Sequence, residues 1–120
     1  MSELLEKSAI TSEELEVLLD ERDAGKADFL LVDVRELPEY DSMHVKGVDM
    51  LKATSTFQAW GEEFYNEHKD KKVIIFTCRS GHRSGQVQSV FIKSGMSNVI
   101  NHAGGIISYR GEKIEEWQSF

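Results

Sequence analysis

Two short, mostly apolar runs constrain the fold of this chain more than any other feature of its sequence. One covers residues 29–34 (FLLVDV) and the other covers residues 73–77 (VIIFT). Their length suits strands that are covered on both faces of a sheet. Helical patterns lie before, between and after them, and strands that alternate with helices predict a parallel sheet. The chain is therefore expected to be an α/β protein with a mostly parallel central sheet.

The first predicted helix has clear signals at both of its ends. Thr11 and Glu14 are spaced as a capping box, in which each side chain binds the backbone N–H of the other residue. Gly25 is suited to the left-handed backbone that ends many helices. The helix is therefore expected at about 12–24.

The other expected elements are less sharply bounded. Phe57, Trp60 and Phe64 recur at helical spacing, and we interpret them as core residues. In the helix after the second apolar run, the residues expected to be buried are Val87, Val90 and Phe91. The remaining elements are expected to be a helix at 39–43, a strand at 48–51, a helix capped by Ser55 or Thr56, a helix from Arg83 or Ser84 to Gly95, a strand at 98–101 and, within 112–120, a terminal helix that packs Ile114 and Trp117.

Size and charge narrow the class of protein. A chain of 120 residues predicts a single domain over 1–120. The net charge of −7 argues against nonspecific binding to nucleic acid or to an anionic membrane. No apolar run is long enough to span a bilayer and no secretory signal is visible, so a cytoplasmic location is expected. A single cysteine allows neither an internal disulfide nor a resolving thiol.

The second apolar run leads into a small polar loop, Cys78-Arg79-Ser80-Gly81-His82-Arg83. A lone cysteine is usually a small buried hydrophobe. Here it ends a strand and is followed by two arginines, a histidine and a glycine that permits a tight path. Backbone N–H groups of such a loop, together with the start of the next helix, form an anion site. These donors are expected to lower the pKa of Cys78 and to hold an anionic persulfide.

The first apolar run ends in Asp33-Val34-Arg35. In open α/β sheets the functional groups gather beyond the carboxyl ends of the strands. The segments 33–35 and 78–80 are therefore expected to meet in space.

The sequence resembles the rhodanese family in several segments. The loop itself resembles the active-site loop of that family, and 31–36 (LVDVRE), 39–40 (EY) and 44–48 (HVKGV) resemble its N-terminal signature. Gly104-Gly105-Ile106 is similar to its C-terminal signature. The chain departs from the family pattern at Lys46, where proline is common, and at Tyr109, where tryptophan often follows the paired glycines.

The resemblance implies a rhodanese-like three-layer fold and a set of residue roles. Cys78 would be the nucleophile, and the amides from Arg79 to Arg83 would cradle the persulfide. Asp33, Arg35 and Glu39 would be supports. Arg83 would pair with Glu39 or Asp33, whereas Arg79 would attract an anionic donor. Ser80, Gly81 and His82 would line the pocket, and His82 is not needed as a base because the amides already stabilise the thiolate.

The implied activity is a two-step sulfur transfer. The Cys78 thiolate would take sulfur from an anionic donor such as thiosulfate and pass it to cyanide or a thiol, and a protein acceptor is a possible physiological partner. No cofactor is expected. No metal is expected either, because His44, His68 and His102 lack metal-ligand spacing.

Two alternatives remain open from the residues. The first is a small cysteine-based phosphatase or arsenate reductase. Such phosphatases place five residues between cysteine and arginine, often after a histidine, whereas Cys78 and Arg83 are separated by four and follow Thr77. The second alternative is a binding or sulfur-carrier module that keeps the fold without the chemistry.

Overall fold

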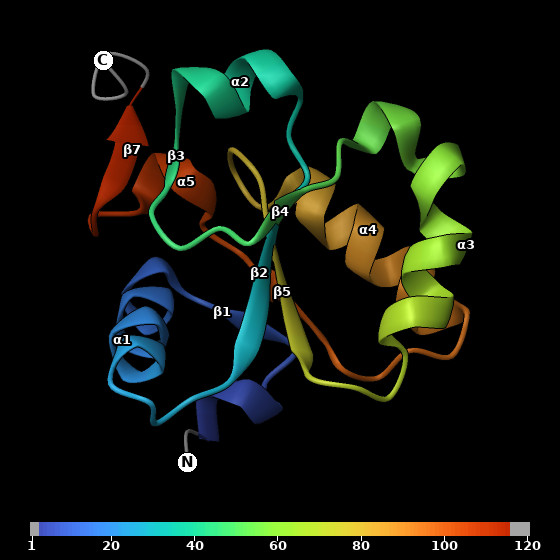
Figure 1. Ribbon diagram of the computed structural model, residues 1–120, viewed down its shortest axis with the longest axis horizontal. Coiled ribbons are helices and arrows are strands. Elements are labelled where there is room, and N and C mark those ends of the chain that lie inside the picture. Colours follow the sequence, from blue (N-terminus) through green and yellow to red (C-terminus); the bar gives the residue numbers. More distant parts are fainter. Residues whose placement is uncertain (1–2, 116–120) are drawn as a thin grey trace.

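A five-stranded parallel sheet forms the centre of the computed structural model, which describes residues 3–115, and helices lie on both sides of it (Figure 1). Every neighbouring pair in this sheet is parallel, which confirms the predicted α/β architecture. The order across the sheet is β1 (Ala9–Ile10), β6 (Val99–His102), β5 (Val73–Thr77), β2 (Phe29–Asp33) and β4 (Met50–Leu51).

Two hydrophobic cores lie on opposite faces of the sheet. Helices α1 (Ser12–Asp23) and α5 (Gly105–Ser108) contribute to the first core. Helices α3 (Phe57–His68) and α4 (His82–Lys93) contribute to the second core. The two groups of helices lie on opposite sides of β2 and β5 in Figure 1. The fold therefore has three layers.

The pairing of β2 with β5 explains why both segments are apolar along most of their length. Leu31 is in register with Ile75, and both contribute to the core beside α1. Val32 is in register with Phe76, and both contribute to the core beside α3 and α4. Successive side chains of a strand point to opposite faces, so a strand covered on both faces needs apolar residues at successive positions.

Helix α1 begins and ends with the predicted signals. The hydroxyl of Thr11 accepts a hydrogen bond from the N–H of Glu14, and the Glu14 carboxylate accepts one from the N–H of Thr11. The predicted capping box is therefore confirmed. Gly25 has a φ of 76°, in the left-handed region that favours glycine.

The segment near residue 115 differs from expectation, because 113–115 form a strand and not a helix. Strand β7 (Lys113–Glu115) pairs antiparallel with β3 (Met43–Val45). Here Ile114 lies opposite His44, so the expected helix is wrong for this segment. Trp117 lies outside the described residues. The N–H of Lys46 donates to the carbonyl of Glu112 at 3.0 Å, a bond that proline could not make.

Several other boundaries and one core residue also differ from the sequence-based expectations. Val90 is 46% exposed, because the buried stripe of α4 passes through Val87 and Phe91 and leaves Val90 beside it. The expected strand at 48–51 is reduced to β4, and strand β3 was not expected. The remaining elements are the short helix α2 (Leu37–Ser42) and two 3₁₀ turns, Glu3–Glu6 and Thr54–Thr56.

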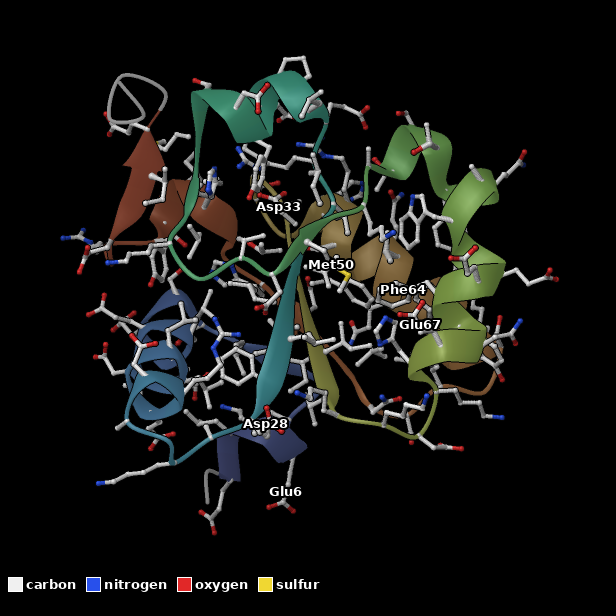
Figure 2. All side chains as sticks on the ribbon, viewed as in Figure 1. Glu6, Asp28, Asp33, Met50, Phe64 and Glu67 are labelled. Atoms are coloured by element: carbon white, nitrogen blue, oxygen red, sulfur yellow. The ribbon has the colours of Figure 1, made fainter. Side chains whose placement is uncertain are left out.

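The carboxyl edge of the sheet brings together the ends of β2 and β5. The N–H of Val34 donates to the carbonyl of Thr77 at 2.9 Å, which joins the two strand ends. Figure 2 shows Asp33 and Asp28 near opposite ends of β2, with Asp33 at the end nearer α2. The residues that follow Asp33 and Thr77 therefore share one edge, as expected for a parallel sheet. Within 3–115, no helix combines the length and the apolar character needed to cross a bilayer.

Candidate active site

Cys78 is the first residue after β5, and the next three residues turn the chain into α4. Gly81 caps that helix with a φ of 94°. A Cβ atom at this position would lie 2.0 Å from the carbonyl oxygen of Ala103. The turn therefore needs glycine for two reasons, its left-handed backbone and its close approach to another segment.

The sulfur atom of Cys78 lies at the centre of several hydrogen-bond donors. The N–H of Gly81 is 3.1 Å from Sγ and the N–H of Ser84 is 3.4 Å away. The hydroxyl of Ser84 lies 3.3 Å from the same atom. Cys78 is only 1% exposed. These donors lie at the N-terminal end of α4, where backbone N–H groups have no partner within the helix and the helix dipole favours an anion.

The electrostatic balance at this sulfur favours the thiolate. Burial on its own raises the pKa of Cys78, but hydrogen bonds from Ser84, Ser80 and Gly81 outweigh it and lower the pKa below its ordinary value. A lower pKa leaves more thiolate near neutral pH, and the thiolate is the nucleophilic form of cysteine. The shift has the direction expected from the sequence.

The paired-glycine turn supports the cysteine loop from the adjacent segment. The N–H of Ile106 donates to the carbonyl of Cys78 at 2.9 Å, and the N–H of Ile107 donates to that of Arg79 at 3.0 Å. Gly105 has a φ of 67°, and a Cβ there would lie 2.2 Å from the Arg79 carbonyl oxygen. The two segments therefore contact each other through their backbones.

Arg83 forms a bidentate ion pair with Glu39. Its Nη1 and Nη2 atoms lie 2.7 Å and 2.9 Å from the two carboxylate oxygens. The Arg83 guanidinium is the main cause that lowers the pKa of Glu39 to about 2, and the pair raises the pKa of Arg83. Of the two partners considered for Arg83, the structure selects Glu39. The pair connects α4 to α2.

Asp33 pairs with Arg35 at the end of β2. Its Oδ2 atom lies 2.9 Å from Nη2 of Arg35, and its Oδ1 accepts the Arg35 N–H at 2.9 Å. Arg35 also donates to the carbonyl of Met43 at 2.6 Å. Both side chains are buried. The pair therefore orders the chain that leads into α2 and β3.

The outward-facing residues of the loop are Arg79, Ser80 and His82, all of which are exposed. Among residues 3–115, Arg79 forms no salt bridge. Its guanidinium is thus free to meet an anion from solvent.

Sequence reasoning missed Ser84 and Asn101. The expected cradle ended at Arg83, although Ser84 is the third residue of α4 and its N–H belongs to the unpaired first turn. Its position in the first turn of the helix was the sequence feature that could have identified Ser84 as part of the cradle. Asn101 donates from Nδ2 to the carbonyl of Gly81 at 3.2 Å, and no local pattern marked this contact.

His102, also missed as a site residue, is a fully buried histidine in β6, beside the strand that leads into Cys78. Its Nδ1 lies 2.8 Å from the hydroxyl of Thr77, and its Nε2 lies 2.8 Å from that of Ser12. The Ser12 hydroxyl is in turn 2.6 Å from that of Ser108. Burial lowers the pKa of His102 to about 4. The imidazole is therefore neutral near pH 7 and links β5, β6, α1 and α5.

The fold and the site together define an α/β protein with a buried cysteine whose sulfur is surrounded by hydrogen-bond donors at the carboxyl edge of a parallel sheet. The family model described as the rhodanese-like domain matches residues 13–112. The chain belongs to this family.

Relatives and solved structures agree with that assignment. The chain is 28% identical over 102 residues to a probable adenylyltransferase/sulfurtransferase, MoeZ, of Mycobacterium tuberculosis, and the match covers 85% of this chain and 24% of that protein. It is 31% identical to the thiosulfate:glutathione sulfurtransferase of Saccharomyces cerevisiae, over 78% of this chain and 77% of that protein. A rhodanese-like domain protein of Staphylococcus aureus superposes with a TM-score of 0.68 at 21% identity, over 88% of this chain and 94% of that one.

The chain spans about a quarter of the length of the first curated relatives it matches. Distant relatives named sulfurtransferases support a place in a sulfurtransferase family.

Proposed function

We propose that this chain is a sulfurtransferase that carries a sulfane sulfur as a persulfide on Cys78. The observation that carries the proposal is the set of donors around Sγ, two backbone N–H groups and one hydroxyl within 3.1–3.4 Å. Such a site stabilises an anionic sulfur, whether it is the thiolate or the persulfide. The donor is an anion such as thiosulfate, and the acceptor is cyanide or a thiol.

The reaction has two displacement steps. In the first, the Cys78 thiolate attacks the outer sulfur of thiosulfate, a new S–S bond forms, and the old S–S bond breaks to release sulfite with its electron pair. In the second, cyanide or a thiolate attacks the terminal sulfur of the persulfide and Sγ leaves as the thiolate. Charge is conserved in both steps, and this two-step exchange predicts ping-pong kinetics.

The acceptor class has support from one relative. The yeast protein's name states that it uses thiosulfate and glutathione. By analogy, we propose a low-mass thiol as one acceptor for this chain, and a protein sulfur acceptor as a second candidate.

The position of Arg83 supports sulfur chemistry over phosphate chemistry. A cysteine phosphatase uses its loop arginine to hold the oxygens of the phosphoryl group. Here both terminal nitrogens of Arg83 are hydrogen-bonded to Glu39 outside the cradle. The four residues between Cys78 and Arg83 also make a shorter loop than the phosphatases have.

The proposal is tested by intact-protein mass spectrometry after incubation with thiosulfate. The chain is expected to gain the mass of one sulfur atom and to lose it on addition of cyanide. Cys78→Ser, which contains no thiol, is the control and is expected to gain nothing. An equal gain in that variant, or no gain in the wild type, would overturn the proposal.

The two arginines of the loop are expected to differ in effect. Arg79→Ala should raise the KM for thiosulfate with little change in stability, because its exposed cation helps to capture the donor. Arg83→Ala should also lower the free energy of unfolding, by about 1 kcal/mol, because its ion pair with Glu39 is partly exposed. Steady-state kinetics and urea unfolding measure both effects. Equal and negligible changes would identify both arginines as ordinary surface charges.

A further inference from the structure

The Ser84 hydroxyl is unusually placed for a serine in the first turn of a helix. Serine side chains inside helices commonly donate to a backbone carbonyl one turn earlier. The Ser84 hydroxyl instead donates to Sγ of Cys78, at 3.3 Å. Ser84 is 0% exposed, so water does not compete for this hydroxyl. One enclosed hydroxyl therefore donates to the sulfur of Cys78.

The Ser84 hydroxyl is enclosed together with the sulfur, since Ser84 is 0% exposed and Cys78 is 1% exposed. A sulfur donor arrives from solvent, and because Ser84 is fully buried, the donor does not need to displace this hydroxyl to reach Sγ. The hydroxyl can therefore keep its contact with Sγ while the terminal sulfur comes and goes.

We propose that the hydroxyl of Ser84 is a catalytic hydrogen-bond donor that remains on Sγ of Cys78 through both steps and stabilises the thiolate as the leaving group when the acceptor takes the sulfur. This deepens the proposed sulfur transfer and rests on it for the second step. Its effect on the free thiolate does not depend on any sulfur substrate.

The chemistry of thiolates gives the proposal a specific signature. Removing a hydrogen bond to the anion raises the pKa of the thiol, and a more basic thiolate is a better nucleophile but a poorer leaving group. Ser84→Ala is therefore expected to load sulfur well at high pH and to discharge it slowly. A change that only disordered the loop would slow both steps together.

The first test measures alkylation of Cys78 by iodoacetamide as a function of pH, in the full chain and without any sulfur donor. Ser84→Ala should raise the apparent pKa by about one unit. With a Brønsted coefficient of about 0.4–0.5, alkylation should be about threefold slower than wild type below both pKa values and about threefold faster above them. The two rate profiles should cross.

The second test separates the two steps by single-turnover mass spectrometry above both pKa values. Ser84→Ala should form the persulfide from thiosulfate at least as fast as wild type, and cyanide should remove the sulfur more slowly. Persulfide discharge at the wild-type rate or faster would overturn the proposal.

Matched variants exclude simpler explanations. Ser89→Ala makes the same change at an exposed position of the same helix and should match wild type. Ser84→Thr restores a hydroxyl and should move the alkylation profile back toward wild type, while circular dichroism reports whether each variant is folded. An unchanged alkylation pKa in folded Ser84→Ala would overturn the role of the hydroxyl. If wild type carries no sulfur, the crossing profiles can still appear, so the two proposals fail separately.

Discussion

Gly81→Ala is expected to lower the free energy of unfolding by about 3 kcal/mol and to slow sulfur transfer by about a hundredfold. A non-glycine residue in the left-handed region costs about 1–2 kcal/mol, and forcing a methyl group into a packed site costs about 1–3 kcal/mol. Both terms apply, because Gly81 has a φ of 94° and its Cβ would lie 2.0 Å from the Ala103 carbonyl oxygen. The backbone must shift, and the N–H that lies 3.1 Å from Sγ moves with it. Loss of one such donor typically costs about a hundredfold or more in rate.

Gly25→Ala is the matched control for this effect. Gly25 also has a left-handed backbone, with a φ of 76°, but within 3–115 a Cβ added there would meet no atom within 4 Å beyond its own chain neighbours. Its substitution should therefore cost only about 1 kcal/mol and leave sulfur transfer unchanged. Urea unfolding and the thiosulfate-to-cyanide assay measure the two variants together. Gly81→Ala with the stability of Gly25→Ala and full activity would contradict the tight contact with Ala103.

Acid is expected to remove up to about 3 kcal/mol of stability through His102. The ordinary pKa of 6.5 applies to the unfolded chain, whereas burial lowers the folded value to about 4. The unfolded chain therefore binds the proton more readily. The contribution of His102 to the free energy of unfolding is fully present above pH 6.5 and is lost as the pH falls toward 4. Its size is about 1.4 kcal/mol per unit of pKa difference.

The effect of His102 can be separated from other titrations. His102→Gln keeps polar atoms for the hydroxyls of Thr77 and Ser12 but cannot titrate, so its unfolding free energy should depend much less on pH between 6.5 and 4.5. His68, which is half-buried and has a pKa lowered chiefly by burial, is the control site. The lowered pKa of Glu39 acts in a more acidic window, from about 4.5 to about 2. The same change of unfolding free energy with pH in wild type and His102→Gln would contradict the prediction.

Local patterns predicted the fold because each pattern reports a requirement of its own element. The apolar runs that became β2 and β5 had to be covered on both faces. The capping signals of α1 satisfy N–H groups within the same turn. The prediction was weaker where the period was ambiguous. Val90 was assigned to the core, yet it lies at the edge of the buried stripe of α4 and is 46% exposed.

In the candidate site, too, some features could be predicted from the sequence and others could not. Cys78 and the loop around it could be recognised from sequence, because the strand, the polar turn and the start of the helix are contiguous. Ser84 also lay within reach of that reasoning, since it occupies the first turn of α4. The short strand β7 did not, because its partner β3 is far away in the chain and a strand of three residues has too short a pattern to show its period.

The sequence by itself determined the α/β class, the candidate nucleophile Cys78 and the turn that follows it, because residues close together in the chain specify all three. The tertiary structure alone decided that Glu39 is the partner of Arg83, 44 positions away, and that His102 lies between Thr77 and Ser12, 25 and 90 positions away. It also decided that Ala103 lies against Gly81. These contacts depend on how the strands are ordered in the sheet, and no local periodicity encodes that order.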